Sequence, residues 1–285
     1  MTAGGKVQPG LHFVATPIGS ARDITLRALD VLAGADVIAA EDTRTARRLM
    51  EIHGVAVAGR PMIAYHDHSS ASARAGLLKL LTEGKSVAYV SEAGTPLVAD
   101  PGYQLGRAAI QAEVPVWTAP GASAALAALS VSGLASDRFL FAGFPPPQAG
   151  ARRKWLEGLD AAGATVILYE SPKRVHRTLG ELCEVLGDQR EVALCRELTK
   201  RFEEVLRGTC GQVRDRIAEH PVKGEIVLVI ARGTGSETSE ADIEAALLAA
   251  MQEMPLKQAA AQVAQDLNLS KRDLYQLGLR LKDDD

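Results

Sequence analysis

The chain has 285 residues, of which 47% are apolar and 24% charged, and its formal net charge is −3. This composition is typical of a globular protein with room for two domains, and the weak negative charge excludes nucleic-acid binding through overall charge, though not through a local basic patch. Three cysteines, Cys183, Cys195 and Cys210, lack metal-ligand spacing and indicate a reduced, cytoplasmic protein. Neither a signal-peptide pattern nor an apolar run of membrane-spanning length occurs, so we expect no membrane association.

Short apolar runs alternate with amphipathic helical patterns along the first half of the chain. Strands are predicted at residues 11–15, 37–40, 62–65, 87–90 and 116–119. Helices are predicted at residues 23–33, 43–53, 70–83, 103–112 and 122–131. Asp23 is the expected N-cap of the first helix, with Leu26, Leu29 and Leu32 on its buried face. The alternation predicts an α/β fold in which crossover helices join parallel strands.

The second half predicts a different sheet. A strand at residues 139–144 is followed by the Pro-rich stretch 145–150, which has the composition of a linker or an exposed loop. Further elements are predicted in the order helix 152–159, strand 165–169, helix 173–186, and strands 192–196, 204–207 and 226–230. Because three of these strands follow one another closely, we expect a mixed sheet with an antiparallel part.

The last segment of the chain is predicted to be helical, at residues 241–251 and 256–267 and in a third helix capped by Ser270. Lys271 and Arg272 open this third helix, which gives the pair the outline of a helix-turn-helix; a helical hairpin for dimer contacts is the alternative. We therefore expect five parts: a disordered N-terminus (1–10), an α/β domain (11–137), a second α/β domain (138–232), a linker (233–239) and a helix-turn-helix-like tail (240–285).

Four loops follow the carboxyl ends of predicted strands, where ligands bind in open α/β sheets. They are residues 16–20, 41–44, 91–102 and 120–124. The third is the most informative, because Gly94, Pro96, Pro101 and Gly102 fix a long, rigid backbone that a ligand can approach closely. No G-x-G-x-x-G pattern occurs, so a dinucleotide site is not indicated.

The polar residues in the loops after the predicted strands can also be explained by a structural role, without a ligand. Asp42 or Thr43 can cap the following helix, and Ser123 can do the same after the fourth loop. His66 and His68 lack a third ligand at useful spacing, so no metal site is expected. Two basic clusters, residues 169–174 and 196–201, would form a positive patch suited to a phosphate backbone, or else are solvated charges.

Together the loops resemble the motifs of the tetrapyrrole methylase superfamily and, more closely, of its rRNA-modifying branch. The motifs are Val14-Ala-Thr-Pro-Ile-Gly19, Ala40-Glu-Asp-Thr-Arg44, Tyr65-His-Asp-His68, residues 91–102, Pro120-Gly-Ala-Ser123, Tyr169-Glu-Ser-Pro-Lys-Arg174, Glu197-Leu-Thr-Lys200 and Lys223-Gly-Glu225. The resemblance spans about residues 11 to 231, and the helical tail is similar to that branch's C-terminal region. It implies a class III methyltransferase fold of two α/β domains, with a parallel first sheet and a mixed second one. It also implies S-adenosylmethionine as methyl donor, no metal, and the 2′-hydroxyl of a decoding-centre cytidine in 16S rRNA of the small ribosomal subunit as target.

The resemblance also assigns cofactor contacts. They are Pro17, Ala93, Gly94, Thr95, Val98, Ser123, Ala124, Tyr169, Glu170, Leu198 and Thr199. Corrin- and porphyrin-modifying relatives carry G-x-G-P-G-D in the first loop and G-D-P in the third, whereas this chain has Thr16-Pro-Ile-Gly19 and Gly94-Thr-Pro96. This departure favours RNA as substrate. Smaller departures from the rRNA branch are Glu92 in place of aspartate, Ser20 in place of asparagine, and Pro172-Lys173.

Methyl transfer from a sulfonium is an in-line displacement that depends mainly on positioning, and a base helps because a ribose hydroxyl is weakly acidic. The candidate bases are Glu41, Asp42, His66, Asp67 and Asp100. We expect one acid among Glu41, Asp42 and Asp100 to take the proton, and Arg44 to orient the sugar or phosphate. The expected RNA contacts are Lys173, Arg174, Lys200, Arg201, Lys271 and Arg272.

Two rival functions remain open at this point. One is methylation of a tetrapyrrole small molecule, against which the first loop and the basic tail argue. The other is a non-catalytic RNA-binding or assembly protein that keeps the fold. We also expect a homodimer, because the family has two domains and extensive apolar helices.

Overall fold

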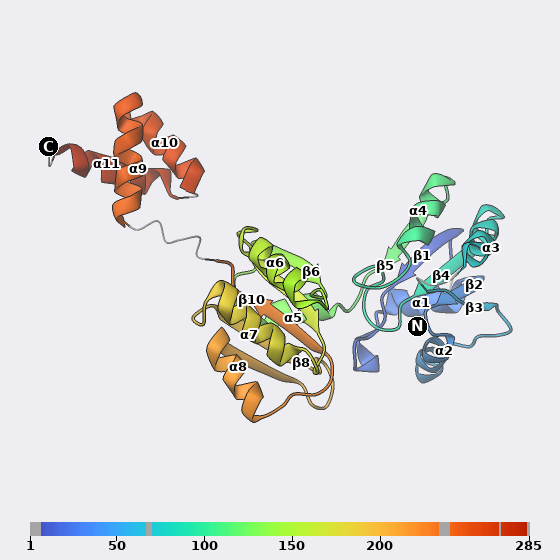
Figure 1. The fold of residues 1–285 in the computed structure, drawn as a ribbon. Helices are drawn as coiled ribbons and strands as arrows, with labels where there is room; N and C mark the ends of the chain where they lie inside the picture. Colours follow the sequence, from blue (N-terminus) through green and yellow to red (C-terminus); the bar gives the residue numbers. More distant parts are fainter. Residues whose placement is uncertain (1–6, 67–69, 234–239, 268, 284–285) are drawn as a thin grey trace. The chain divides into compact units, whose positions relative to one another are not determined.

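The computed structural model describes residues 7–66, 70–233, 240–267 and 269–283 (Figure 1). Contacts divide the chain into two compact units, Met1–Ala231 and Arg232–Asp285, which are treated separately below. Most of the predicted N-terminal tail and linker, together with Asp67 and His68, lie outside the described residues.

The first unit contains two five-stranded sheets, of which the first is entirely parallel, as predicted. Its strand order is β3-β2-β4-β1-β5. The strands are β1 (Gly10–Val14), β2 (Val37–Ala40), β3 (Met62–Ala64), β4 (Ser86–Val90) and β5 (Val116–Ala119). Every residue of β2 and β4 is buried, which fits central strands covered by helices on both faces.

Helices cover both faces of this sheet. They are α1 (Leu26–Gly34), α2 (Thr43–Ile52), α3 (Ala71–Thr82) and α4 (Tyr103–Gln111). One apolar cluster joins α1 and α2 to one face, and another joins α3 and α4 to the opposite face.

The predicted start of α1 was wrong. Asp23 lies in a short 3₁₀ turn, η1 (Ala21–Asp23), and the true cap is Thr25, whose hydroxyl accepts a hydrogen bond from the Ala28 amide at 3.1 Å. The helix consequently buries Ala28, Val31 and Leu32, while Leu26 is 80% exposed. Thr25 is itself a favourable cap residue, so the leucine spacing placed the start too early.

The second sheet is mixed, as predicted, with the strand order β6-β7-β10-β8-β9. Its strands are β6 (Phe139–Gly143), β7 (Thr165–Glu170), β8 (Glu191–Arg196), β9 (Glu204–Thr209) and β10 (Ile226–Ile230). Only β6 and β7 pair in parallel; β10 runs antiparallel to both β7 and β8, and β8 runs antiparallel to β9. Strands β7 and β8 therefore end at the same edge of the sheet, where β10 begins.

Helices from both halves of the sequence enclose this second sheet. One face packs against α6 (Ala149–Asp160), α7 (Val175–Leu186) and α8 (Cys210–Glu219). The other face packs against α5 (Ala124–Ser132), which follows β5 in sequence and lies beside β10 (Figure 1). Helix α5 thus carries the chain from the first sheet onto the second. Residues 145–148 form a loop between β6 and α6 that is largely exposed, as one of the two interpretations of the stretch 145–150 predicted, although Pro145 is buried and α6 begins at Ala149.

The second unit consists of α9 (Glu240–Glu253), α10 (Leu256–Leu267) and α11 (Lys271–Asp283) around a small core. The core residues are Leu247, Ala259, Ala260, Val263 and Leu274. Ser270 caps α11 as predicted, accepting a hydrogen bond from the Asp273 amide at 3.4 Å. Across the parts of the chain with described coordinates, no helix has both the length and the apolarity of a membrane span.

Candidate functional site

A pocket of about 370 Å³ lies where loops from both sheets of the first unit meet; we call it the central pocket. The loop after β4 contributes Ala93, Gly94, Thr95, Val98 and Asp100 to its lining. Ser123 and Ala124 come from the start of α5, and Tyr169 and Glu170 from the end of β7. The structure therefore brings most of the predicted cofactor contacts, and one candidate base, into a single cavity.

The loop of residues 91–102 is held in place by hydrogen bonds to two other loops. Gly94 and Thr16 exchange backbone hydrogen bonds of 3.0 and 2.9 Å, and the Ser91 hydroxyl donates to the Gly94 carbonyl at 2.8 Å. The Thr95 hydroxyl donates to the Ala122 carbonyl at 2.9 Å. Three of the strand-end loops picked out from the sequence are thus tied into one wall.

Left-handed backbone is concentrated in two loops of the first unit. Leu97 and Ala99 have φ of 73° and 57°, and Glu197 and Thr199, in the loop after β8, have φ of 50° and 64°. A non-glycine residue in this conformation costs about 1–3 kcal/mol and persists only where the surroundings impose it. Such strain is typical of functional sites, and both loops belong to the predicted motifs.

Aromatic rings form the wall that the second sheet contributes. The ring of Tyr169 meets those of Phe141 and Phe144 edge-on, with centroids 4.9 and 5.5 Å apart. Burial raises the pKa of the Tyr169 hydroxyl, and the carboxylates of Asp100 and Glu225 add to the effect. Phe144 lines the pocket although 55% of it is exposed, and no feature of the sequence had indicated it.

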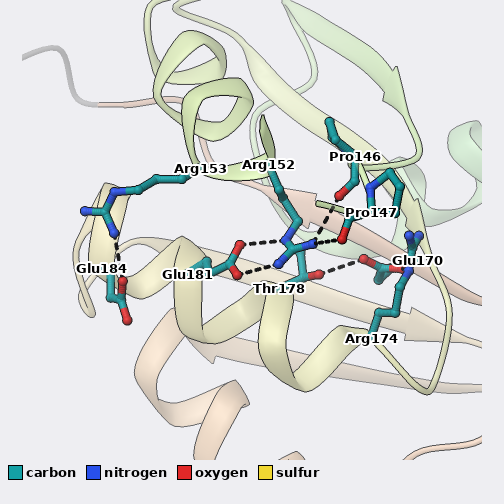
Figure 2. Close-up of polar contacts among 9 residues, drawn as sticks. All are labelled: Pro146, Pro147, Arg152, Arg153, Glu170, Arg174, Thr178, Glu181 and Glu184. Carbon is teal, nitrogen blue, oxygen red and sulfur yellow. Dashed lines mark hydrogen bonds and ion pairs between the residues drawn. The ribbon is translucent and has the colours of Figure 1, made fainter. Parts of the chain in front are cut away.

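Glu170 is a fully buried carboxylate whose partners come from the protein itself (Figure 2). It accepts hydrogen bonds from the Ser171 amide at 2.7 Å, the Arg174 guanidinium at 2.8 Å and the Thr178 hydroxyl at 2.7 Å. These bonds join the end of β7 to the start of α7. Glu170 therefore fixes the shape of the wall, and the positive charge of Arg174, predicted as an RNA contact, is paired with it.

Beside Glu170, Arg152 forms a second buried ion pair that supports the same wall (Figure 2). Its guanidinium makes a two-point contact with Glu181, in which Nε lies 2.6 Å from Oε2 and Nη2 contacts Oε1. Nη1 donates to the carbonyls of Pro146 and Pro147 at 3.1 and 3.0 Å. Hydrogen bonding to Arg152 holds the pKa of Glu181 below its usual range. Because Pro146 and Pro147 lie two and three residues after Phe144, this network fixes the chain that carries Phe144.

The described lining of the central pocket does not include three of the predicted cofactor contacts, Pro17, Leu198 and Thr199. They lie where the loop after β1 packs against the loop after β8. The Ser20 amide donates to the Thr199 hydroxyl at 3.1 Å. A Cβ on Gly19 would lie 2.6 Å from both Thr199 Oγ1 and Lys200 Cγ. The loop of residues 16–20 is therefore packed against the loop after β8, and Ile18 reaches the pocket in place of Pro17.

The pocket is completed by Gly224 and Glu225, just before β10, and by Ile226 and Val227 at the start of β10. Gly224 has φ of 89°, and a Cβ there would collide with the side chain of Glu197. That side chain accepts hydrogen bonds from the Glu225 amide and the Lys200 ammonium, both at 2.9 Å. Lys200, a predicted RNA contact, is paired with Glu197 and Glu225.

The three candidate acids differ in position. Asp42 caps α2 and pairs with Arg44 at 2.7 Å, which lowers the pKa of Asp42 to about 2. Glu41 keeps one buried carboxylate oxygen, Oε2, without a hydrogen-bond partner in the described part of the chain. Of the three, Asp100 lines the central pocket.

The remaining predicted contacts are spread over several elements. Lys173 is exposed in the loop after β7, and Arg201 stacks on the Phe202 ring 5.5 Å from its centroid. Lys271 and Arg272 are exposed at the start of α11, in the second unit. The described residues contain no cluster of three histidines, cysteines or acids suited to a metal ion.

The two-sheet architecture of the first unit defines a known class of methylase folds. The solved structure of cobalt precorrin-4 methyltransferase aligns with 78% of this chain and 94% of its own, with a TM-score of 0.57 and 16% identity. The methyltransferase CobJ aligns with 79% and 94%, with a TM-score of 0.60 and 19% identity. At these identities the likeness concerns the fold alone.

Sequence relatives define the family more closely. The family model described as tetrapyrrole (corrin/porphyrin) methylases matches residues 10–214, and one described as the RsmI C-terminal HTH domain matches residues 237–282. Ribosomal RNA small subunit methyltransferase I of Mesorhizobium japonicum is 46% identical over 97% of this chain and 94% of its own length. The Haemophilus influenzae protein of that name is 42% identical over 94% and 96%. The chain therefore belongs to the tetrapyrrole methylase family and, within it, to the ribosomal RNA small subunit methyltransferase I group.

Proposed function

We propose that this protein transfers a methyl group from S-adenosylmethionine to the 2′-hydroxyl of a cytidine in the decoding centre of 16S rRNA. The observation that carries the proposal is the 46% identity to a ribosomal RNA small subunit methyltransferase over nearly the whole length of both chains. The match of residues 237–282 to a helix-turn-helix domain of that group supports an RNA substrate. The same proposal makes the protein a cytoplasmic RNA-binding enzyme, and the homodimer stays a prediction from the resemblance.

The central pocket fits the proposed cofactor in size and chemistry. Its volume of about 370 Å³ lies within the usual range for small-molecule sites, roughly 300–1,000 Å³. Small residues such as Ala93, Gly94 and Ala124 expose backbone groups to a ligand, and Asp100 and Glu225 supply negative charge for a cationic one. When bound, S-adenosylmethionine supplies an activated methyl group on a positively charged sulfur.

The chain's own residues would position the ribose and accept its proton. Asp100 is the preferred base, because it is the candidate acid that lines the pocket. Asp42 is less suited: with a pKa of about 2 it is a weak base at neutral pH, and its bonds to Arg44 and the start of α2 give it a structural role. Glu41 remains an alternative because of its unpartnered oxygen.

Mass mapping of 16S rRNA tests this proposal. RNA from a strain lacking the protein should lack one ribose methyl, and the wild-type gene should restore it. An Asp100→Asn gene should restore it slowly or not at all, whereas an Asp42→Asn gene should restore it at a near-normal rate. A complete set of rRNA methyl groups in the deletion strain would refute the function.

Methylation of a tetrapyrrole is the second candidate, because the family model describes corrin and porphyrin methylases and the solved cobalt precorrin-4 methyltransferase shares the fold. That structure is 16% identical to this chain. A mass increase of one methyl group in a porphyrinoid incubated with the protein and S-adenosylmethionine would favour it.

A further inference from the structure

Two smaller hollows adjoin the central pocket along the edge of the second sheet where β7 and β8 end. The first, which we call the apolar hollow, has a volume of about 250 Å³ and is lined mainly by Pro172, Val175, Ile217, Pro221 and Val222. Pro172 also lines the central pocket, so the two are neighbours. The apolar hollow lies at the start of α7 and the end of α8, which pack side by side (Figure 1).

The second, the cationic hollow, has a volume of about 350 Å³ and shares Pro221 and Val222 with the apolar one. Its charged lining consists of Arg196, Arg216 and Lys223, with His220 beside them and Glu204 as the acid among the described lining residues. Glu204 pairs with Arg196 at 2.7 Å. Arg216 and Lys223 are exposed and have no ion pair with any described residue, so they leave an excess of positive charge.

One five-residue segment, residues 221–225, borders all three cavities. Pro221 and Val222 line both hollows, Lys223 lines the cationic one, and Gly224 and Glu225 line the central pocket. The hollows therefore form a continuous series that leads from the central pocket across the sheet edge to a cluster of cations. Proteins hold single-stranded nucleic acid in a positively charged groove that follows the phosphates, with bases stacked on rings beside it. Here Arg216 and Lys223 supply the charge, and His176 supplies a ring among the apolar residues.

The start of α7 strengthens this match. Its N-cap, Arg174, makes no side-chain cap bond, and Val175 and His176 of the first turn line the apolar hollow. The helix dipole gives such a helix start a partial positive charge that favours phosphate. The Val175 amide already donates to the Ser171 carbonyl at 3.0 Å, so α7 contributes its dipole and the remaining first-turn amides.

From these observations we infer that the apolar and cationic hollows form a binding subsite for single-stranded RNA next to the modified nucleotide, in which Arg216 and Lys223 contact phosphates. This inference rests on the proposed function, because it takes rRNA as the substrate of the central pocket. It assigns RNA contacts to Arg216, which lies outside the motifs, and to Lys223, to which the resemblance gave no role. It gives less weight to Arg174 and Lys200, whose charges are paired within the protein.

Arg216 has a competing role, since it lies in the last turn of α8, where a cation also offsets the negative end of the helix dipole. The test therefore combines RNA binding with thermal stability. The variant is the double substitution Arg216→Gln and Lys223→Gln in the full chain. Its control is Lys154→Gln, which removes one exposed charge from α6, outside the residues that line the two hollows.

The probe is a short, labelled single-stranded RNA, titrated at several salt concentrations. The double variant should bind it about tenfold more weakly than the wild type. Its slope of log affinity against log salt should fall by up to roughly 1.4, or about 0.7 for each lost phosphate contact. The control should match the wild type, and S-adenosylhomocysteine affinity should be unchanged in both variants, which shows that the central pocket is intact.

Three results would overturn the inference: a wild type that does not bind this RNA at low salt, a double variant with wild-type affinity and slope, or a lowered melting temperature with unchanged RNA binding. The last would leave Arg216 with only its structural role at the end of α8. The mass mapping described above tests the proposed function separately. If the wild-type protein methylates rRNA and the double variant binds the probe RNA as tightly as the wild type, the subsite is refuted and the proposed function stands.

Discussion

The two sheets build opposite walls of the central pocket by different physical means. The first sheet contributes backbone: Gly94, Leu97 and Ala99 adopt left-handed conformations in a loop held by hydrogen bonds to Thr16 and Ala122. The second sheet contributes paired charges behind a layer of aromatic rings. One wall is therefore shaped by conformational constraint and the other by buried electrostatics, so they should respond to different substitutions.

Removal of the buried guanidinium should have the largest effect. Arg152→Gln leaves Glu181 and the Pro146 and Pro147 carbonyls without their donor, and breaking a buried ion pair costs about 3–5 kcal/mol. Urea unfolding should show a loss of that size. Arg153→Gln is the matched control, because Arg153 is the next residue, 52% exposed and also paired with glutamates, and its loss should cost under about 1 kcal/mol. Equal losses for the two variants would show that the Arg152 network does not support the wall.

Gly224→Ala should have the next largest effect, and on ligand binding. The added Cβ would collide with Glu197, whose carboxylate orders Glu225 and Lys200 at the pocket. We expect S-adenosylhomocysteine to bind about 30-fold more weakly, which corresponds to roughly 2 kcal/mol. Gly187→Ala is the control, because Gly187 has nearly the same φ (88° against 89°) but open space around its Cβ. If both variants lost S-adenosylhomocysteine affinity equally, the loss would come from backbone strain and not from the collision with Glu197.

The Arg152–Glu181 pair should also give the stability a specific pH dependence. The folded state lowers the pKa of Glu181, so the pair stabilises the protein above the unfolded glutamate pKa of about 4.3, and this contribution is lost as pH falls through the lower folded value. Glu181→Gln should therefore cost about 2 kcal/mol at pH 7, less than Arg152→Gln, because the introduced amide oxygen and the Pro146 and Pro147 carbonyls still accept hydrogen bonds from Arg152. The difference in unfolding free energy between wild type and variant should shrink below about pH 4. A difference that stayed constant down to pH 3 would mean that Glu181 is not charged in the pair.

Relief of backbone strain in the first wall should give the smallest effect. Ala99→Gly removes a left-handed conformation costing about 1–3 kcal/mol but adds the chain entropy of glycine, about 0.5–1 kcal/mol, so stability should rise by about 1 kcal/mol within a range of about 0–2.5 kcal/mol. Cofactor affinity should nevertheless fall severalfold, because the loop is less preorganised. Ala58→Gly, at φ 51° outside the pocket lining, should change stability alone. Tighter binding by Ala99→Gly would contradict a role for the strain in shaping the site.

The sequence was sufficient to predict features that depend on neighbours along the chain. Both sheets, the Asp42 and Ser270 caps and the loop at Gly94 follow from apolar periodicity, strand-end position and local residue chemistry. The parallel first sheet was recognisable because its buried strands are separated by helical patterns.

Features that depend on partners distant in sequence could not be predicted. Arg152 reads as an ordinary helix residue until Glu181, 29 residues away, is placed beside it. Helix α5 is rich in small residues and gives no indication that it covers the second sheet. Gly224 belonged to a recognised motif, but its role became clear only from its closeness to Glu197.

Calorimetric titration of S-adenosylhomocysteine into the full-length protein tests the central claim most directly, namely that the two walls together form the cofactor site. We predict one saturable site per chain, weakened by Gly94→Val in the first wall and independently by Tyr169→Ala in the second, and unchanged by the surface variant Lys154→Gln. An absence of binding, or binding that neither wall substitution affects, would contradict the account.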